Sequence, residues 1–87
     1  MAIVRVIHEN VLGCQRVAFD SHAEARMTER GVTEDEVLAV LRNPDQTGLP
    51  TLRHRLRYRK EVAPGRLVDV VFELDPTEVV VFSVWAH

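Results

Sequence analysis

The sequence predicts an α+β domain in which two short helices pack on a three- to four-stranded antiparallel sheet, with an extra N-terminal strand as an option. Two helix-start signals lie early in the chain, and three segments with strand character follow them without another helix. This order differs from the alternation of strands and helices in a parallel doubly wound fold. With 87 residues, 46% of them hydrophobic and 28% charged, the chain has room for one domain, 1–87, made of an extension, 1–16, and a core, 17–87.

The N-terminal extension is predicted to contribute strand structure. Residues 3–8 and 16–19 are rich in β-branched and aromatic side chains, and the turn residues Asn10 and Gly13 lie between them. These strands either extend the sheet of their own chain or pair with a second chain. A homodimer is therefore one of the arrangements that the sequence leaves open.

The first helix is predicted to begin at Ser21. Ser21 and Glu24 have the spacing of a capping box, in which the hydroxyl accepts from a backbone amide while the carboxylate reaches back. Residues with high helix propensity follow. Gly31 then ends the helix, because glycine adopts the left-handed conformation that a helix C-terminus requires.

A second helix follows after a three-residue turn. Thr33 and Glu36 form another capping box, and three acidic residues lie at the positive end of the helix dipole. Apolar residues then recur at helical spacing, and Asn43–Pro44 ends the helix.

Three strands are predicted in the second half of the chain, after a loop over Asp45–Thr51. They cover 52–62, 67–74 and 79–85, and turn residues separate them. The short connections favour an antiparallel meander. The second and third strands are apolar enough to be covered on both faces.

The first of these strands is strongly basic on one side. Strict alternation places four arginines on one face of the strand: Arg53, Arg55, Arg57 and Arg59. Neighbouring charges on that face lie about 6–7 Å apart, close to the spacing of phosphates along a nucleic-acid strand. The alternative is a salt-bridged surface, since Asp69 and Glu73 on the next strand are placed to neutralise the arginines.

The first helix carries a second group of basic residues. His22, Arg26 and Arg30 are four residues apart and therefore lie on one side of the helix. Arginine binds phosphate through two hydrogen bonds, and an imidazole can exchange protons near neutral pH. The alternative is that the arginines pair with Glu29 and other acids and that His22 is an ordinary first-turn residue.

Composition narrows the classes of function. The net charge of −2 argues against binding nucleic acid through overall charge, although a local basic face is compatible with it. The four histidines lack the spacing of metal ligands, so no metal site and no cofactor are expected. The single cysteine forms no internal disulfide, so a cytoplasmic location is expected. No segment approaches the ~20 apolar residues of a membrane helix. Trp85 lies near His87, leaving an aromatic ring and an imidazole together at the end of the last strand.

A motif in the helical region resembles a known family. The run SHAEARMTERGVTEDEV, which starts at Ser21, and the later Arg42–Asp45 segment resemble the signature of small bacterial domains of unknown function, the DUF4258-type domains. The resemblance covers about Val17–Trp85. These domains are in turn similar to the RelE- and barnase-like ribonucleases and toxins. The resemblance thus implies two N-terminal helices on an antiparallel sheet, and RNA and an antitoxin protein as partners.

The activity implied by this resemblance is metal-independent cleavage of RNA, in which the ribose 2′-OH attacks the adjacent phosphate. Such a reaction needs proton transfer and cations near the phosphate. The resemblance implies catalytic roles for His22, Arg26, Arg57 and His87, with His87 assigned by fold analogy alone. Contacts with RNA phosphates are expected from five further basic residues: Arg30, Arg53, Arg55, Arg59 and Lys60.

Two other functions compete with this one. A non-catalytic module would use the arginine-rich strand to hold nucleic acid or an acidic protein segment, with a steep dependence on salt. An oligomeric structural domain would use its N-terminal strand to complete the sheet of a partner.

Overall fold

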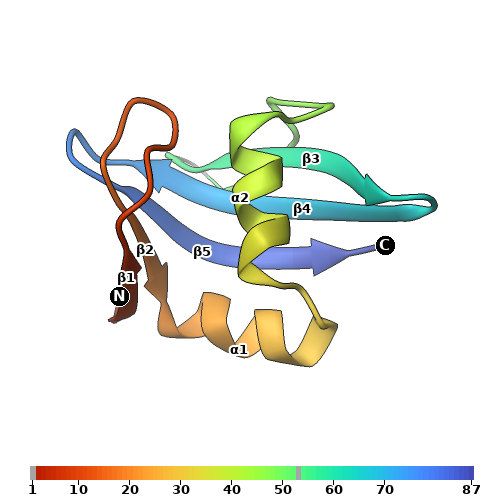
Figure 1. Ribbon diagram of the computed structural model, residues 1–87, viewed down its shortest axis with the longest axis horizontal. Coiled ribbons are helices and arrows are strands. Elements are labelled where there is room, and N and C mark those ends of the chain that lie inside the picture. The colour runs from red at the N-terminus through yellow and green to blue at the C-terminus, as the bar shows by residue number, and fades with distance from the viewer. Residues whose placement is uncertain (1, 53) are drawn as a thin grey trace.

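The computed structural model describes residues 2–52 and 54–87. The elements in this part of the chain are β1 (Ile3–Ile7), β2 (Val17–Asp20), α1 (Ser21–Arg30), α2 (Glu34–Arg42), β3 (Leu56–Ala63), β4 (Arg66–Leu74) and β5 (Val79–Ala86). The strands form one sheet in the order β1-β2-β5-β4-β3 (Figure 1). The predicted α+β class with two helices is confirmed.

The predicted sheet of three to four antiparallel strands is wrong in two respects. The sheet has five strands in the described residues, and it is mixed, because β2 pairs parallel with β5. The parallel pair follows from the helical connection, which crosses one face of the sheet and returns the chain at its far edge. β3 therefore runs in the same direction as β2, and two antiparallel pairings, β3 with β4 and β4 with β5, give β5 that direction too.

The N-terminal extension adds a strand to its own sheet. β1 pairs antiparallel with β2, with Ile7 opposite Val17. The backbone amide of Ala2 donates to the Asp20 carboxylate at 2.9 Å, which fixes the start of β1 beside the end of β2. Of the two arrangements left open by the sequence, the strand thus takes the intramolecular one.

The helix boundaries agree with the sequence except at one cap. The N-cap of α1 is Asp20 rather than Ser21, and its carboxylate accepts from the backbone amide of His22 at 2.9 Å. An anionic carboxylate gains more than a hydroxyl at the positive end of the helix dipole, and Asp20 binds Ala2 as well. Gly31 ends α1 in the left-handed conformation, and the Thr33–Glu36 capping box is present.

The two helices cover the sheet in different ways. α2 crosses one face of the sheet and packs on β3 and β4, whereas α1 lies beside β5 (Figure 1). We call the side toward α2 the helix face and the opposite side the open face. The core fills the space under α2, and its largest buried side chains include Phe19, Leu41, Val70, Phe72 and Val81.

α1 takes the place of a neighbouring strand along part of β5. Within the part of the chain that the structure describes, β2 pairs with residues 79–81 of β5, and the later part of this strand has no strand partner on that side. α1 continues from the end of β2, and the Arg30 guanidinium donates to the Val84 carbonyl at 2.6 Å. The charge of Arg30 is thereby fixed at the edge of the sheet.

β3 is shorter than the predicted strand over 52–62. Regular pairing begins at Leu56, and His54 has a φ of 68°, which an extended strand does not allow. The preceding loop instead runs along the outer edge of β3, where the Asp45 and Gln46 amides donate to the Arg59 carbonyl. Within β3 the predicted alternation is confirmed, because Leu56 and Tyr58 join the core of the helix face.

The burial of β5 and the length of the helices can also be compared with the predictions from the sequence. The first part of β5 is buried on both faces as predicted, since Val80 and Phe82 form a small buried cluster with Ala18 on the open face, whereas Trp85 near the end of the strand is 42% exposed. No helix in residues 2–52 and 54–87 is long and apolar enough to cross a membrane.

The C-terminus of α1 provides a test of the fold. Gly31 has a φ of 64°, and a Cβ at this position would meet no atom within 4 Å, so substitution costs only backbone strain. We expect Gly31→Ala to lower the free energy of unfolding by about 1 kcal/mol in urea denaturation. Gly31→Asn is the matched control and should lose less, because asparagine tolerates the left-handed region. Equal stability of all three proteins would contradict this account of the cap.

Candidate functional site

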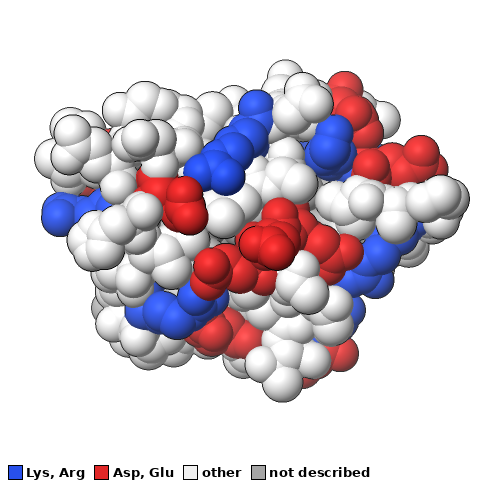
Figure 2. All heavy atoms as spheres, in the orientation of Figure 1, with Lys and Arg blue, Asp and Glu red and all other residues white. Residues whose placement is uncertain are grey.

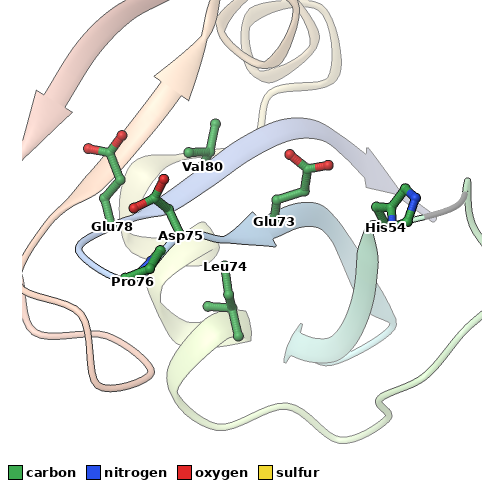
Figure 3. A pocket seen from close by; sticks show the side chains of 7 residues that line it. All are labelled: His54, Glu73, Leu74, Asp75, Pro76, Glu78 and Val80. Atoms are coloured by element: carbon green, nitrogen blue, oxygen red, sulfur yellow. The ribbon is translucent and has the colours of Figure 1, made fainter.

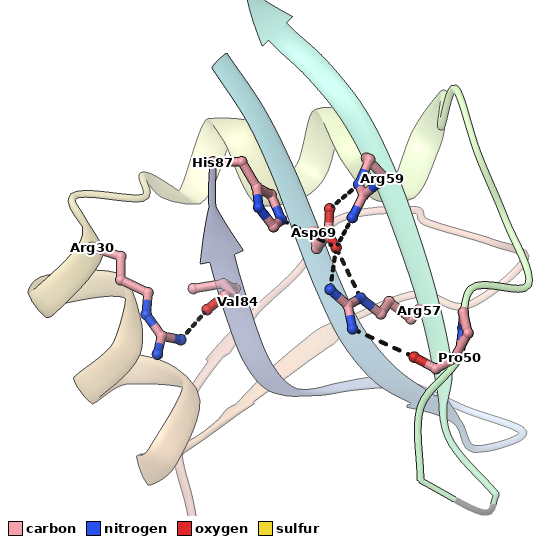
Figure 4. A network of polar contacts seen from close by, with 7 residues as sticks. All are labelled: Arg30, Pro50, Arg57, Arg59, Asp69, Val84 and His87. Atoms are coloured by element: carbon pink, nitrogen blue, oxygen red, sulfur yellow. Dashed lines mark hydrogen bonds and ion pairs between the residues drawn. The ribbon is translucent and has the colours of Figure 1, made fainter. Parts of the chain in front are cut away.

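A cluster of charged side chains lies on the open face, across the first halves of β3 and β4 and beside the end of β5. Arg57 and Arg59 from β3 and His87 after β5 all point toward the carboxylate of Asp69 on β4 (Figure 4). Arg57 reaches Asp69 Oδ2 at 2.8 Å through Nε and at 2.6 Å through Nη2. Arg59 donates from Nε to Oδ1 at 2.6 Å and from Nη2 to Oδ2 at 3.0 Å. We call these four residues the Asp69 cluster.

The register of the sheet places the cluster. Arg59 lies directly opposite Asp69, which in turn lies opposite Trp85 of β5. Residues directly opposite each other share a face of the sheet, and Arg57 lies two positions from Arg59 on the same side. The alternation of arginines with apolar residues in β3 thus brings two guanidinium groups to one carboxylate, while Leu56 and Tyr58 fill the core.

His87 is held beside the cluster by the backbone. Its amide donates to the Leu67 carbonyl at 2.8 Å, and the Leu67 amide donates back at 3.4 Å. The imidazole Nε2 lies 3.5 Å from Asp69 Oδ2, and 43% of the side chain is exposed. The cluster therefore contains an imidazole that is in contact with solvent and next to a buried carboxylate.

Asp69 is fully buried, with 0% of its surface exposed. The two arginines keep its carboxyl group ionised. Burial by itself raises the pKa of the Asp69 carboxyl, but hydrogen bonds and charges from Arg59 and Arg57 outweigh it and hold the pKa below its usual range. Two positive charges from the arginines against one negative charge leave an excess of one positive charge. Both arginine side chains remain about a quarter exposed, so this excess charge is in contact with solvent.

A second cation of the open face lies on an aromatic ring. The Arg30 guanidinium carbon is 3.7 Å from the ring centroid of Trp85, a cation–π contact. Its hydrogen bond to the Val84 carbonyl fixes the group in place (Figure 4). In the described residues Arg30 makes no ion pair with a carboxylate. Its charge thus adds to the excess at the Asp69 cluster.

The remaining basic residues of the β3 region do not lie together. Arg55 stacks on Phe82, with its guanidinium carbon 4.0 Å from the ring centroid, and so belongs to the open face. Lys60 lies on the other side of β3, where its Nζ is 3.7 Å from Asp45 Oδ1. Arg53, which the sequence also indicated as a phosphate contact, lies outside the described residues.

The early part of α1 carries the other two predicted catalytic residues. His22 is exposed in the first turn, and Arg26 forms a 2.6 Å ion pair with Glu29. Both share the side of α1 that carries Arg30. Within residues 2–52 and 54–87, neither side chain makes a hydrogen bond or ion pair with the Asp69 cluster. The structure thus brings Arg57, Arg59 and His87 together and leaves His22 and Arg26 on the neighbouring helix.

A pocket of about 370 Å³ lies at the other end of the β4–β5 hairpin (Figure 3). Three carboxylates, from Glu73, Asp75 and Glu78, contribute to its lining together with His54. Such a lining repels phosphate, so the pocket is a poor site for RNA. The described residues hold no group of three or more histidine, cysteine or acidic side chains arranged to bind a metal ion.

The two faces of the molecule differ in charge. Figure 2 views the molecule from the α2 side and shows acidic side chains near the centre of that face. The first turn of α2 alone contributes Glu34, Asp35 and Glu36. The slightly negative net charge of the chain therefore coexists with a local excess of positive charge on the open face.

Comparison with known proteins identifies a family. A family model described as a domain of unknown function, DUF4258, matches residues 19–86. The chain belongs to the DUF4258 family. The resemblance predicted from the helical motif is thus confirmed, over almost the same span. No curated protein and no solved structure matches the chain.

Two features of this DUF4258 domain were beyond sequence reasoning. Asp69 was expected only as one of two neutralising acids, whereas it binds three cationic or titratable side chains at once. The contact of Arg30 with Trp85 joins residues far apart in the sequence and had no signal there. The sequence showed only that Trp85 lies near His87 at the end of the last strand.

The buried carboxylate makes a specific prediction for the stability of the DUF4258 domain. Asp69→Asn removes the charge that neutralises Arg57 and Arg59, and we expect the free energy of unfolding to fall by about 3 kcal/mol at pH 7. The matched control is Glu29→Gln, which removes an exposed ion-pair partner and should cost about 0.5 kcal/mol or less. Urea denaturation measures both.

The stabilisation that Asp69 provides should depend on pH, and the Asp69→Asn variant tests this. The pKa of Asp69 is lower in the folded than in the unfolded chain, so the stabilisation is complete above the unfolded value of about 4 and is lost as the pH falls through the folded value. The difference in stability between the unsubstituted protein and Asp69→Asn should therefore shrink below pH about 4. A difference that stays constant under acid conditions would show that the ionised carboxylate is not its source.

Proposed function

We propose that the DUF4258 domain is a metal-independent endoribonuclease that binds and cleaves RNA at the Asp69 cluster. The observation that carries this proposal is the convergence of Arg57, Arg59 and a solvent-accessible His87 on one buried carboxylate. Guanidinium groups for phosphate and an imidazole for proton transfer are the two kinds of group that attack by a 2′-OH requires.

Phosphate binding is supported by the unbalanced charge of the cluster. Arg57 and Arg59 use Nε and one terminal nitrogen for Asp69, and the other terminal nitrogen of Arg57 donates to the Pro50 carbonyl at 3.4 Å. A guanidinium has five N–H donors, so each arginine retains donors for a phosphate oxygen. Asp69 also fixes both groups in place, so that little side-chain entropy is lost when RNA binds.

The proton-transfer role falls to His87. An imidazole can take the proton of the 2′-OH as this oxygen attacks phosphorus, and the imidazolium that forms is stabilised by the carboxylate 3.5 Å away. Asp69 itself is unsuited to be the acid, because its lowered pKa keeps it ionised at neutral pH. Its role is to position His87 and the two arginines.

The leaving 5′-oxygen needs a proton from a second group. His22 is our candidate, because it is exposed and shares the side of α1 on which Arg30 reaches β5.

A relation to the RelE- and barnase-like ribonucleases is part of the same proposal. It is supported by the order of two helices followed by three antiparallel strands, with basic residues on the face away from α2.

Cleavage of a single-stranded RNA in the presence of EDTA tests the proposal. We expect the unsubstituted protein to give products with 2′,3′-cyclic phosphate and 5′-OH ends. His87→Ala should lower the rate by a factor of about 100 or more, and Arg57→Gln by a comparable factor. Arg42→Gln is the matched control, because it removes an arginine that pairs with Glu9 outside the cluster, and it should cleave normally.

Two results would overturn parts of the mechanism. Undiminished cleavage by folded His87→Ala protein would remove His87 from the reaction. Undiminished cleavage by His22→Ala would leave water as the proton donor to the leaving group.

The second candidate function is RNA binding without cleavage. It is favoured by the engagement of both arginines with Asp69, which leaves the cluster a modest charge for stabilising a transition state. This candidate predicts intact RNA after long incubation and an affinity that falls steeply with salt. Retention of labelled RNA on native gels at two salt concentrations distinguishes it from the nuclease.

A further inference from the structure

The open face has an exposed aromatic ring beside the Asp69 cluster. Trp85 is 42% exposed, whereas Phe82 on the same face is buried beneath Arg55. Trp85 lies directly opposite Asp69 across the β4–β5 pair, and neighbouring strands are about 5 Å apart. The ring is therefore one strand away from the carboxylate that holds Arg57, Arg59 and His87.

The ring is also held in position. Arg30 stacks 3.7 Å from its centroid and is itself fixed by the hydrogen bond to Val84. An exposed tryptophan kept in place by a stacked cation is a rigid, partly apolar platform with a positive charge over one face of its ring. Such a pairing suits a flat aromatic ligand that also carries negative charge.

We propose that Trp85 and Arg30 form a stacking site for one unpaired nucleobase, which makes single-stranded RNA the substrate of the DUF4258 domain. This inference rests on the proposed function of the Asp69 cluster. A nucleotide that binds Arg57 and Arg59 through its phosphate brings its own base, or that of its neighbour, within reach of the ring.

The geometry selects against duplex RNA. In an A-form helix the faces of the bases are covered by their neighbours, and the major groove is too deep and narrow for side chains. The exposed surface of Trp85 therefore finds a base to stack on only where a base has left the helix. Every base has an aromatic face, so the site favours single strands without selecting a particular sequence.

The fluorescence of the protein tests this proposal directly, because Trp85 is its single tryptophan. The probe is a short oligoribonucleotide with 2′-O-methyl sugars, which lacks the attacking hydroxyl and stays intact. We expect the single strand to quench the emission. The same oligonucleotide in a duplex, and inorganic phosphate alone, should leave the emission nearly unchanged. Equal quenching by duplex and single strand, or no quenching by the single strand, would overturn the proposal.

Substitution adds a second measurement. Trp85→Leu should weaken binding of the labelled single strand by about tenfold or more in fluorescence anisotropy, while Trp85→Phe should retain most of the affinity because it keeps an aromatic face. Leu74→Ala is the matched control. It removes another exposed apolar side chain, which lines the acidic pocket, and should bind normally. Equal binding by folded Trp85→Leu and the unsubstituted protein would exclude the stacking site.

The binding assay and the cleavage assay test the two proposals independently. If the single strand quenches Trp85 but RNA stays intact, the nuclease proposal falls and the stacking site stands. If RNA is cleaved in EDTA but Trp85→Leu binds and cleaves normally, the stacking site falls and the nuclease proposal stands.

Discussion

The burial of one carboxylate between two guanidinium groups is the interaction on which the open face depends. A buried charge is tolerated only when other charges and hydrogen-bond donors replace the water that it has lost, and Asp69 obtains these from Arg57 and Arg59. The same bonds hold the arginines in place against their mutual repulsion. The cluster is therefore both a stabilising contact between β3 and β4 and a fixed arrangement of cations. A mobile row of arginines would have to lose side-chain entropy whenever it bound an anion.

The second constraint is the incomplete pairing of β5. Because β2, in the described residues, pairs with only the first part of this strand, α1 covers the remaining edge and supplies Arg30 to a backbone carbonyl there. A helix at this edge can project a side chain past the edge and onto the open face, whereas another strand would have continued the sheet. The chain thereby adds a cation from its first helix to the face formed by its last three strands.

Segregation of charge gives a slightly acidic chain a local surface with an excess of positive charge. Acidic side chains gather on the side that carries α2, and the pocket at the β4–β5 turn is lined by carboxylates. Positive charge is concentrated on the open face, across the first halves of β3 and β4 and beside the end of β5. Because screening limits such fields to about 10 Å at ordinary salt, the local arrangement matters more than the sum of the charges. For the function that we propose, contact with a few nucleotides therefore fits this surface better than a long nucleic-acid track.

The sequence by itself determined most of the elements of this protein and the basic side of β3. Capping residues, Gly31 and the alternation in β3 act over a few residues, so they predicted both helices, the meander and the arginine side of β3. The tertiary structure decided the parallel placement of β2, the choice of Asp20 over Ser21 as the cap, and the grouping of Arg57, Arg59 and His87 around Asp69. It also decided that Arg30 lies on Trp85, while His22 and Arg26 stay on the neighbouring helix. These outcomes depend on strand order and register, which arise when segments distant in the chain compete for the same core, and no local pattern encodes that competition.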